Sequence, residues 1–352
     1  MVALTPRHPA VPGRPFLPLL TGALGLTLLL TGCGDGQAES VQSDGDSAGA
    51  IDNCGIDVPT DPVPERVFAA YQPAIEMAHA LGISDRLVGT AFLDAVVIEE
   101  YAEAQEEQEY YASLPSREEL LNLEPDFVLT GYNDTFTDDT FGTRGSLSEL
   151  GISSWIFSPL CPSEDGLSDA TIDPADVTME NVYADLRDLG ALFGETDRAE
   201  DVIAEMEATV EEVTMVVADA EDEPEVLIAR PSDEGFQVAS GQDFGTEIID
   251  LAGGVNAAGD LDERRNVTIS TEDVIERDPD VILIDVCCDA EMTAADAADD
   301  VASVLDDPAL ANVTAVKEEQ VHEFTFADRA AGVRSATAVA QVAELIHPDL
   351  FD

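Results

Sequence analysis

The stretch Leu121–Tyr132 reads LNLEPDFVLTGY, and a second stretch, Val274–Val286, reads VIERDPDVILIDV. Each has a helix-like lead, an acidic residue before Pro-Asp, and a short apolar run. Their prolines, Pro125 and Pro279, are 279 − 125 = 154 residues apart. A short apolar run bounded by a turn signal predicts a buried strand. Its recurrence predicts a related sheet in each half of the chain.

The surrounding elements support two related lobes. In both halves the order is helix, glycine stop, strand, helix, acid-Pro-Asp corner, strand, with glycine stops at Gly82 and Gly253-Gly254. A chance preference of helix-to-strand corners for Pro-Asp is the alternative, but the matching order favours a repeat. The expected strands are Arg66–Ala70, Leu87–Ala91, Asp126–Thr130, Ile152–Phe157, Glu225–Arg230, Asp280–Asp285 and Val321–Phe326.

Short apolar strands that alternate with helices predict a parallel α/β architecture. Residues 177–220 contain few helix breakers and predict one or two long helices. We therefore expect two similar α/β lobes joined by a long helix. The expected boundaries are 51–176 for the N-terminal lobe, 177–222 for the connecting helices and 223–352 for the C-terminal lobe.

The first 50 residues are not expected to belong to the fold. Arg7 and Arg14 precede the apolar run Phe16–Leu30, which predicts an export signal over residues 1–32. The run ends at Leu30-Thr31-Gly32-Cys33, which resembles a bacterial lipobox and would make Cys33 the lipid-modified residue. An ordinary secretory signal with a chance cysteine is the alternative. Residues 33–50 are rich in Gly, Ser and acid, which predicts a flexible acidic tether.

The chain is strongly acidic. It carries 74 Asp and Glu against 15 Lys and Arg, for a formal net charge of −59, yet 45% of its residues are hydrophobic. That charge excludes nucleic acid and anionic lipid head groups as partners, because the long-range field repels both. The hydrophobic content excludes a disordered acidic chain. We hypothesise a folded halophilic protein that works in high salt, where screening removes the self-repulsion.

Four cysteines follow Cys33. Outside the cytoplasm thiols tend to pair, and a bridge between Cys54 and Cys161 would pin the start of the fold. Cys287 and Cys288 are adjacent. For these two, structural indifference, a free pair, a redox pair and thiolate ligands all remain open.

Enzyme signatures are missing from the sequence. It has no GxSxG, HExxH, Walker or GxGxxG motif, and its histidines are scattered, so neither a cofactor nor a protein-bound metal is expected. In so acidic a chain, arginines near strand ends are candidates for binding an oxyanion, and aromatic residues there would wall the cleft. For any single arginine, a salt bridge to one of the many acids is the alternative. The candidate ligand-binding residues are Tyr71, Arg117, Tyr132, Arg144, Arg230, Phe236, Arg264 and Arg334.

With these features the chain resembles the lipid-anchored substrate-binding proteins of bacterial ABC importers for iron–siderophore complexes, haem and cobalamin. The resemblance covers nearly everything from Cys33 to Asp352. The matching segments are Asn53–Gly55, Pro64–Ala91, Pro115–Tyr132, Gly253–Asn256, Glu276–Asp285, Asp307–Phe324, Ala331–Val339 and His347–Phe351.

The resemblance implies two Rossmann-like lobes joined by a long rigid helix, with the ligand in the cleft between them and only modest closure. It also implies a monomeric binding protein, not an enzyme, held at the outer face of the cell membrane by its lipid alone. It would deliver a ferric siderophore or similar iron chelate to a permease and its ATPase. Docking would use one acid on each lobe, by position Glu76 and Asp250, although the family usually has Glu at the second position. A cobalamin or haem binder on the same scaffold is one alternative. An extracytoplasmic thiol or redox protein that uses Cys287-Cys288 is another.

Overall fold

The computed structural model describes residues 49–162, 172–262 and 264–351. The expected signal peptide, Cys33 and nearly all of the expected tether lie outside these ranges. Among the described helices, none combines the length and the apolar character that a membrane span requires.

The N-terminal lobe is built on a parallel sheet with the strand order β5-β4-β3-β6-β7. Its central strands are almost wholly buried, as expected for a parallel sheet covered on both faces. The strands are β3 (Val67–Ala70), β4 (Leu87–Ala91), β5 (Tyr110–Tyr111), β6 (Phe127–Thr130) and β7 (Ser153–Ile156). The helices are α1 (Gln72–Ala80), α2 (Ala102–Glu106), α3 (Arg117–Asn122) and α4 (Arg144–Ser148).

The C-terminal lobe has a mixed sheet with the order β11-β9-β8-β12-β13, and β10 also pairs with β8. Strands β8, β12 and β13 run parallel, while β9 is antiparallel to both β8 and β11. The strands are β8 (Glu225–Ser232), β9 (Gly235–Ala239), β10 (Val255–Asn256), β11 (Asn266–Ile269), β12 (Val281–Val286) and β13 (Val321–Thr325). The helices are α7 (Phe244–Leu251), α8 (Thr271–Arg277), α9 (Ala298–Asp306), α10 (Thr314–Lys317) and α11 (Ser335–Ile346).

The repeated acid-Pro-Asp corner has the same role in both lobes. The residue before each proline adopts a left-handed backbone conformation, with φ of 50° at Glu124 and 45° at Asp278, which turns the chain out of the preceding helix. The carboxylate of Asp126 then accepts hydrogen bonds from the backbone N–H groups of Glu65 and Arg66, at 3.0 and 2.9 Å.

In the second lobe the carboxylate of Asp280 accepts from the N–H of Glu225 at 2.9 Å. Each aspartate therefore satisfies a backbone group at the start of the neighbouring parallel strand, where no ladder partner exists. The repeat in the sequence is a repeat in structure, and the predicted two-lobe α/β fold is confirmed.

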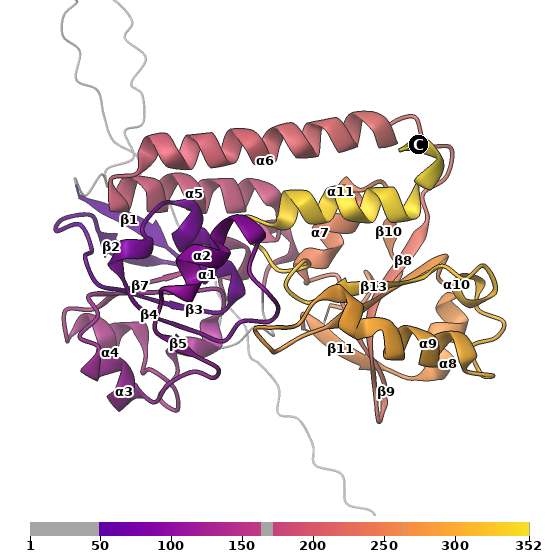
Figure 1. Cartoon of the computed structure of the whole chain (residues 1–352), viewed down its shortest axis with the longest axis horizontal. Coiled ribbons are helices and arrows are strands. Elements are labelled where there is room, and N and C mark those ends of the chain that lie inside the picture. Colours follow the sequence, from indigo (N-terminus) through magenta and orange to yellow (C-terminus); the bar gives the residue numbers. More distant parts are fainter. Residues whose placement is uncertain (1–48, 163–171, 263, 352) are drawn as a thin grey trace, which may run out of the picture. The chain divides into compact units, whose positions relative to one another are not determined.

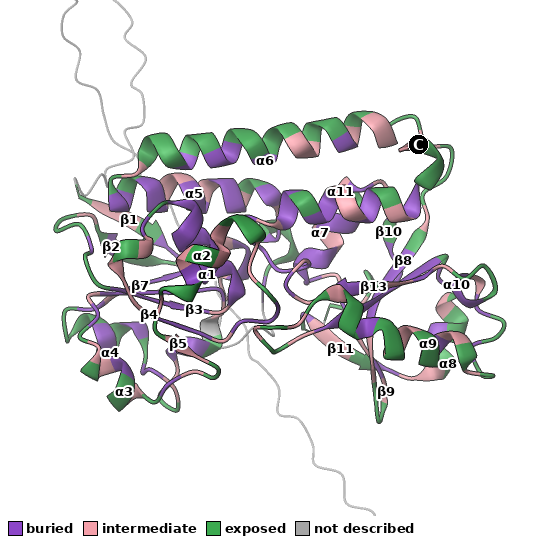
Figure 2. Cartoon of the chain, viewed as in Figure 1, coloured by how far each residue is buried: buried purple, intermediate pink, exposed green. Residues whose placement is uncertain are grey.

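Two helices connect the lobes, α5 (Met179–Phe193) and α6 (Thr196–Val217). They pack on each other, and α11 packs against α6 (Figure 1). Figure 2 shows that α6 is exposed along the face turned away from the sheets and buried along the other. One continuous hydrophobic core runs from the first sheet through α5 and α6 to β8, α7 and α11. Because relative movement of the lobes would disturb this core, we expect only modest closure.

A short hairpin, β1 (Ala50–Asn53) and β2 (Ile56–Pro59), is fastened to the N-terminal lobe. Cys54 in its turn forms a disulfide with Cys161, the pairing expected from the sequence. Arg144 is buried beside it. Its guanidinium donates to the backbone carbonyl and side chain of Asn53 at 2.8 and 2.9 Å, and to the carbonyl of Ser154 at 2.8 Å.

Candidate ligand-binding site

A pocket of about 310 Å³ lies where strand ends of both sheets face each other. Strands β3, β4 and β6 of one lobe and β8, β12 and β13 of the other contribute residues at or just beyond their carboxyl ends. Ligands of open α/β sheets bind at this edge. The lining residues are Tyr71, Phe92, Asp94, Tyr132, Asp134, Arg230, Arg265, Asn266, Cys287, Cys288 and Phe326.

Strained backbone is concentrated at this pocket. Three of the seven described non-glycine residues with positive φ line it: Tyr71 at 70°, Phe92 at 63° and Cys288 at 83°. Such conformations cost about 1–3 kcal/mol each and persist where the surrounding structure imposes them, most often at functional sites. This concentration supports a binding role for the pocket.

The aromatic wall is a connected set of rings. Tyr71 contacts Tyr132 edge-on, with centroids 4.7 Å apart, and Phe92 at 5.1 Å. The guanidinium of Arg265 lies over the Tyr132 ring at 4.8 Å, which is a cation–π geometry. Burial raises the pKa of both tyrosines well above the usual value, with Asp134 adding to the effect at Tyr71. Both therefore stay neutral phenols, and the hydroxyl of Tyr132 is buried without a hydrogen-bond partner.

The C-terminal lobe supplies a cluster of arginines held by buried aspartates. Arg265 donates to Asp243 at 3.2 Å, and Asp243 is fully buried. Arg329 lies behind the pocket, 3.1 Å from the Asp285 carboxylate, with its guanidinium 4.4 Å from the centroid of the Phe326 ring.

Arg230 is the third member of the cluster. Its Nε donates to the backbone carbonyl of Asp285 at 3.0 Å, and one terminal nitrogen, Nη2, is buried with no hydrogen-bond partner. An unpaired buried donor is costly. Arg230 lines the pocket, so an anionic ligand atom that reached this nitrogen would satisfy it.

The N-terminal lobe faces this cluster with a carboxylate. Asp94 is 2% exposed, and its Oδ2 has no hydrogen-bond partner. Burial raises the pKa of Asp94 to about 7, against the opposing field of four arginines, of which Arg230 contributes most. Its backbone carbonyl accepts from the N–H of Cys288 at 2.9 Å, which joins the two lobes at the pocket. Cys288 is itself disulfide-bonded to Cys287.

Of the candidate ligand-binding residues, the pocket brings together Tyr71, Tyr132 and Arg230. The other five do not line it. Arg144 donates a hydrogen bond to the backbone carbonyl of Asn53 in the β1–β2 hairpin. Phe236 is buried in the core of the C-terminal lobe. The two remaining loop and helix residues, Arg117 and Arg264, lie elsewhere, the first close to Gly142 and the second exposed to solvent.

Arg334, the last of the candidates, bonds to protein carboxylates and does not line the pocket. Its Nε donates to Glu76 at 2.9 Å, and its Nη1 donates to Asp328 at 3.0 Å. Burial by itself would lower the pKa of Arg334, but the hydrogen bonds and charge of Glu76 outweigh it and raise the pKa.

The docking assignment of Glu76 is wrong for this structure. Glu76 is 1% exposed, on a helix whose residues are all buried, and its carboxylate accepts hydrogen bonds from Arg334, Gln72 and the N–H of Ile98. A carboxylate in such a place has no surface to offer a partner. Asp250, at the end of α7, is exposed.

The most useful pocket residues escaped the sequence reasoning. Asp94 stands between Leu93 and Ala95 in the mostly apolar loop after β4, and no motif marks it. Arg265 is adjacent to Arg264, and only the fold decides which of the two turns inward. The one available signal was position, because Phe326 and Cys287 directly follow apolar strands, as Tyr132 nearly does.

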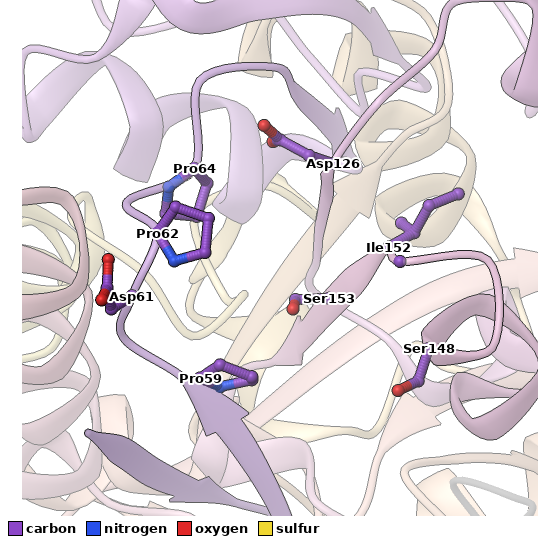
Figure 3. Close-up of a pocket in the computed structure, with 9 residues that line it drawn as sticks. Pro59, Asp61, Pro62, Pro64, Asp126, Ser148, Ile152 and Ser153 are labelled. Atoms are coloured by element: carbon purple, nitrogen blue, oxygen red, sulfur yellow. The ribbon is translucent and has the colours of Figure 1, made fainter. Parts of the chain in front are cut away.

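A second hollow, of about 230 Å³, is lined by three prolines and by residues at the amino ends of β6 and β7 (Figure 3). Its carboxylate Asp126 is already bonded to Glu65 and Arg66. It lies at the opposite edge of the sheet from the ligand side, so we assign it no binding role.

A family model described as periplasmic binding protein matches residues 67–326. The chain belongs to the periplasmic binding protein family. Its members bind solutes and are not enzymes. The matched range includes the whole lining of the pocket between the lobes.

Solved structures have the same fold. A periplasmic binding protein from Veillonella parvula aligns with a TM-score of 0.73 and 24% identity, over 85% of this chain and 97% of that one. A protein of an Fe³⁺-hydroxamate transport system from Saccharomonospora viridis aligns at 0.67 and 24%, over 85% and 98%. A periplasmic haem-binding protein from Roseiflexus aligns at 0.62 and 20%, over 81% and 99%. No curated protein sequence matches the chain significantly.

Proposed function

We propose that this binding protein captures a ferric siderophore or similar iron chelate outside the cytoplasm and delivers it to the permease of an ABC importer. The observation that carries the proposal is the buried, unpartnered Nη2 of Arg230 at a pocket walled by Tyr71, Tyr132 and Phe326. A planar cationic donor beside aromatic rings suits an oxygen-rich anionic ligand. The structural relatives for Fe³⁺-hydroxamate and haem support this class of ligand.

The test is a melting-temperature screen of protein without residues 1–50, in molar salt. Ferric catecholates, ferric hydroxamates, haem and cobalamin are compared. Intrinsic tryptophan fluorescence is a poor readout, because the single tryptophan, Trp155, is fully buried and bonded to Asp185 away from the pocket. We expect the largest rise with an anionic ferric chelate. No rise with any of the four would contradict the proposal.

Arg230→Gln tests the site itself. Removal of the Arg230 guanidinium leaves Asp285 paired with Arg329, so we expect the variant to fold. Loss of a charge-assisted hydrogen bond is worth about 1.5–3 kcal/mol, which is roughly a tenfold to hundredfold loss of affinity. Arg187→Gln, an equal charge change on the surface of α5, is the control and should leave affinity unchanged. Equal loss in both variants would show a general charge effect.

Haem is the second candidate. The pocket presents two phenols, Tyr71 and Tyr132, and a phenolate oxygen is a known axial ligand for haem iron. Against it, burial raises the pKa of both phenols, so ionisation on binding would be costly. Haem absorption spectra of wild type, Tyr71→Phe and Tyr132→Phe distinguish the candidates, because only axial ligation makes the spectrum depend on a hydroxyl group.

We propose that docking on the permease uses Glu118 and Glu272 in place of Glu76. These two acids are related by the repeat, since 125 − 118 and 279 − 272 are both 7. Both are exposed in the first turns of α3 and α8, which begin with the same capping box. In Figure 1 both helices lie at the lower edge of the two-lobed unit, away from α6 at the top.

Charge reversal tests this docking surface in membrane vesicles that contain the importer. Glu118→Lys with Glu272→Lys should abolish uptake while leaving chelate affinity intact. Glu211→Lys with Glu212→Lys, on the exposed face of α6, is the matched control. Asp250→Lys is assayed separately, because Asp250 is exposed and was expected by resemblance. Uptake by the Glu118/Glu272 variant equal to that of the control would rule out this surface.

Lipid anchoring through Cys33 belongs to the same proposal. The lipobox and the acidic tether would hold the binding lobes close to the outer face of the cell membrane. Cys33→Ser should release the protein from the membrane fraction into the medium. Retention of the variant on the membrane would contradict a lipid anchor at this residue.

A further inference from the structure

The wall of the pocket holds a cluster of three potential metal ligands from the two lobes, all among the residues that the structure describes. The sulfurs of Cys287 and Cys288 and a carboxylate oxygen of Asp94 all lie within 4.8 Å of one another. The cysteines follow β12 and the aspartate follows β4, so only the packing of the lobes brings them together. In this structure the sulfurs are joined in a disulfide.

A second observation points to a missing partner at the same place. The Oδ2 of Asp94 is buried without a hydrogen-bond partner, although polar and charged residues also line this pocket. A buried unsatisfied carboxylate oxygen is destabilising. A disulfide has no proton to donate to it, whereas a thiol or a metal ion next to the sulfurs would satisfy it.

We propose that the Cys287–Cys288 pair is a redox-controlled metal site, which in its reduced form binds one thiophilic divalent cation together with Asp94. Two thiolates and a carboxylate are a donor set of the kind that Zn²⁺ and similar ions take, at three of four tetrahedral positions. All three residues line the pocket, so a ligand or water from the pocket would complete the set. The inference goes beyond the chelate function and does not depend on which chelate binds.

The charges around the site favour a divalent cation when the two cysteines are reduced. Arg230 and Arg265 line the same pocket as Asp94 and the two cysteines, and their positive field acts on this wall. Two thiolates and the carboxylate carry −3, and a divalent cation reduces that to −1, which the arginines balance. The same field disfavours a cation while the disulfide is intact, because only the carboxylate then carries negative charge.

The redox step balances with a dithiol as reductant. The dithiol gives two electrons and two protons to the Cys287–Cys288 disulfide, becomes a cyclic disulfide itself, and leaves two protein thiols. Metal binding then forms two sulfur–metal bonds and one oxygen–metal bond and releases the two thiol protons to solvent. In the test a water-soluble phosphine replaces the dithiol, because it leaves no competing thiolate. It is oxidised to the phosphine oxide with an oxygen atom from water.

Cd²⁺ is the probe, since its bonds to thiolate give an ultraviolet charge-transfer band to which the many surface acids do not contribute. Protein reduced under native conditions in molar salt is first titrated for thiols, and Cd²⁺ is then added. Two more thiols are expected in wild type than in the Cys287→Ser/Cys288→Ser variant. The band should saturate at one equivalent in reduced wild type and be absent from the oxidised protein and the variant. Asp94→Asn should keep the thiols and weaken Cd²⁺ affinity by about tenfold or more.

Three results would overturn the proposal: no band in protein with both thiols titrated, an equal band in the Cys287→Ser/Cys288→Ser variant, or no additional thiols in a protein that is still folded. The contrast between oxidised and reduced wild type needs no substitution, so it stands even if a variant folds poorly. Chelate binding is measured on the oxidised protein, so failure of the metal site and failure of the chelate proposal are separate outcomes.

Discussion

Arg334 at the start of α11 is bonded to Glu76 on α1, 258 residues away in the chain, and this pair joins the two lobes. Glu76 is 1% exposed and Arg334 12%. Arg334 also donates to the carbonyl of Val96 in the loop after β4. The contact explains why an acid in the apolar helix α1 is a structural residue and not a surface one.

The pair predicts asymmetric effects on stability. Arg334→Met should lower the free energy of unfolding by about 3 kcal/mol or more, because it leaves the buried carboxylate of Glu76 without its cation. Glu76→Gln should cost less, since Arg334 keeps Asp328. Denaturant unfolding in molar salt measures both. Arg187→Met, which removes only exposed ion pairs of α5, should change stability by less than about 1 kcal/mol. Equal losses in the three variants would show that the pair is not buried as described.

Two interactions, the Cys54–Cys161 disulfide and the hydrogen bonds of Arg144, should hold the β1–β2 hairpin against the N-terminal lobe. Removing the Cys54–Cys161 bridge in the double alanine variant should cost about 2–5 kcal/mol, because it closes a loop of 107 residues. Arg144→Met should cost about 1–3 kcal/mol through the carbonyls of Asn53 and Ser154 that it leaves unbonded. Since both hold the same hairpin, the combined loss should be smaller than the sum. Strict additivity in thermal unfolding would contradict a shared anchor.

The acidic surface should make stability depend on salt. At a net charge of −59, molar NaCl should raise the melting temperature above its value at low salt, because the Debye length falls to about 3 Å. Glu205→Gln/Glu211→Gln/Glu212→Gln on the exposed face of α6 should melt higher than wild type at low salt and respond less to NaCl. An uncharged osmolyte separates screening from general solute exclusion. A melting temperature that stays constant with salt would refute the halophilic interpretation.

His79 should contribute a pH dependence at mildly acidic pH. Burial lowers the pKa of His79 below 6.5, outweighing the raising effects of Gln105 and Glu76. Its ring nitrogens bond to Ser84 at 2.8 Å and Gln105 at 2.9 Å, so the folded state favours the neutral form. The unfolded chain takes up the proton first, and stability is therefore lost as pH falls below 6.5 toward the lower folded pKa.

His79→Gln should flatten that part of the stability profile. The measurement is urea unfolding at a series of pH values from neutral to mildly acidic. His322 also has a pKa lowered by burial, so His322→Gln should remove a separate part of the slope. A profile unchanged by His79→Gln would show that His79 does not titrate differently in the folded protein.

The sequence alone determined the repeat, the strands that follow Pro125 and Pro279, and the α/β class, because burial and turn chemistry leave local patterns. It did not predict the antiparallel strand β9, which makes the C-terminal sheet mixed. It also favoured the Cys54–Cys161 bridge, since few cysteines were left to pair. The repeat and the strands are specified by residues near one another in the chain. The disulfide is specified because so few cysteines allow few pairings.

Only the tertiary structure decided which polar residues meet. Glu76 stands in an apolar helix and Glu118 in a polar one, but neither local sequence identifies the partner of the acid. Nothing local distinguishes the inward Arg265 from Arg264 beside it. Asp94 reaches Cys288 only because β4 and β12 end at facing edges of two different sheets. The position of a buried charged side chain depends on partners that lie tens to hundreds of residues away in the chain. Those partners, and not its neighbours in the sequence, offset the free energy that its burial costs.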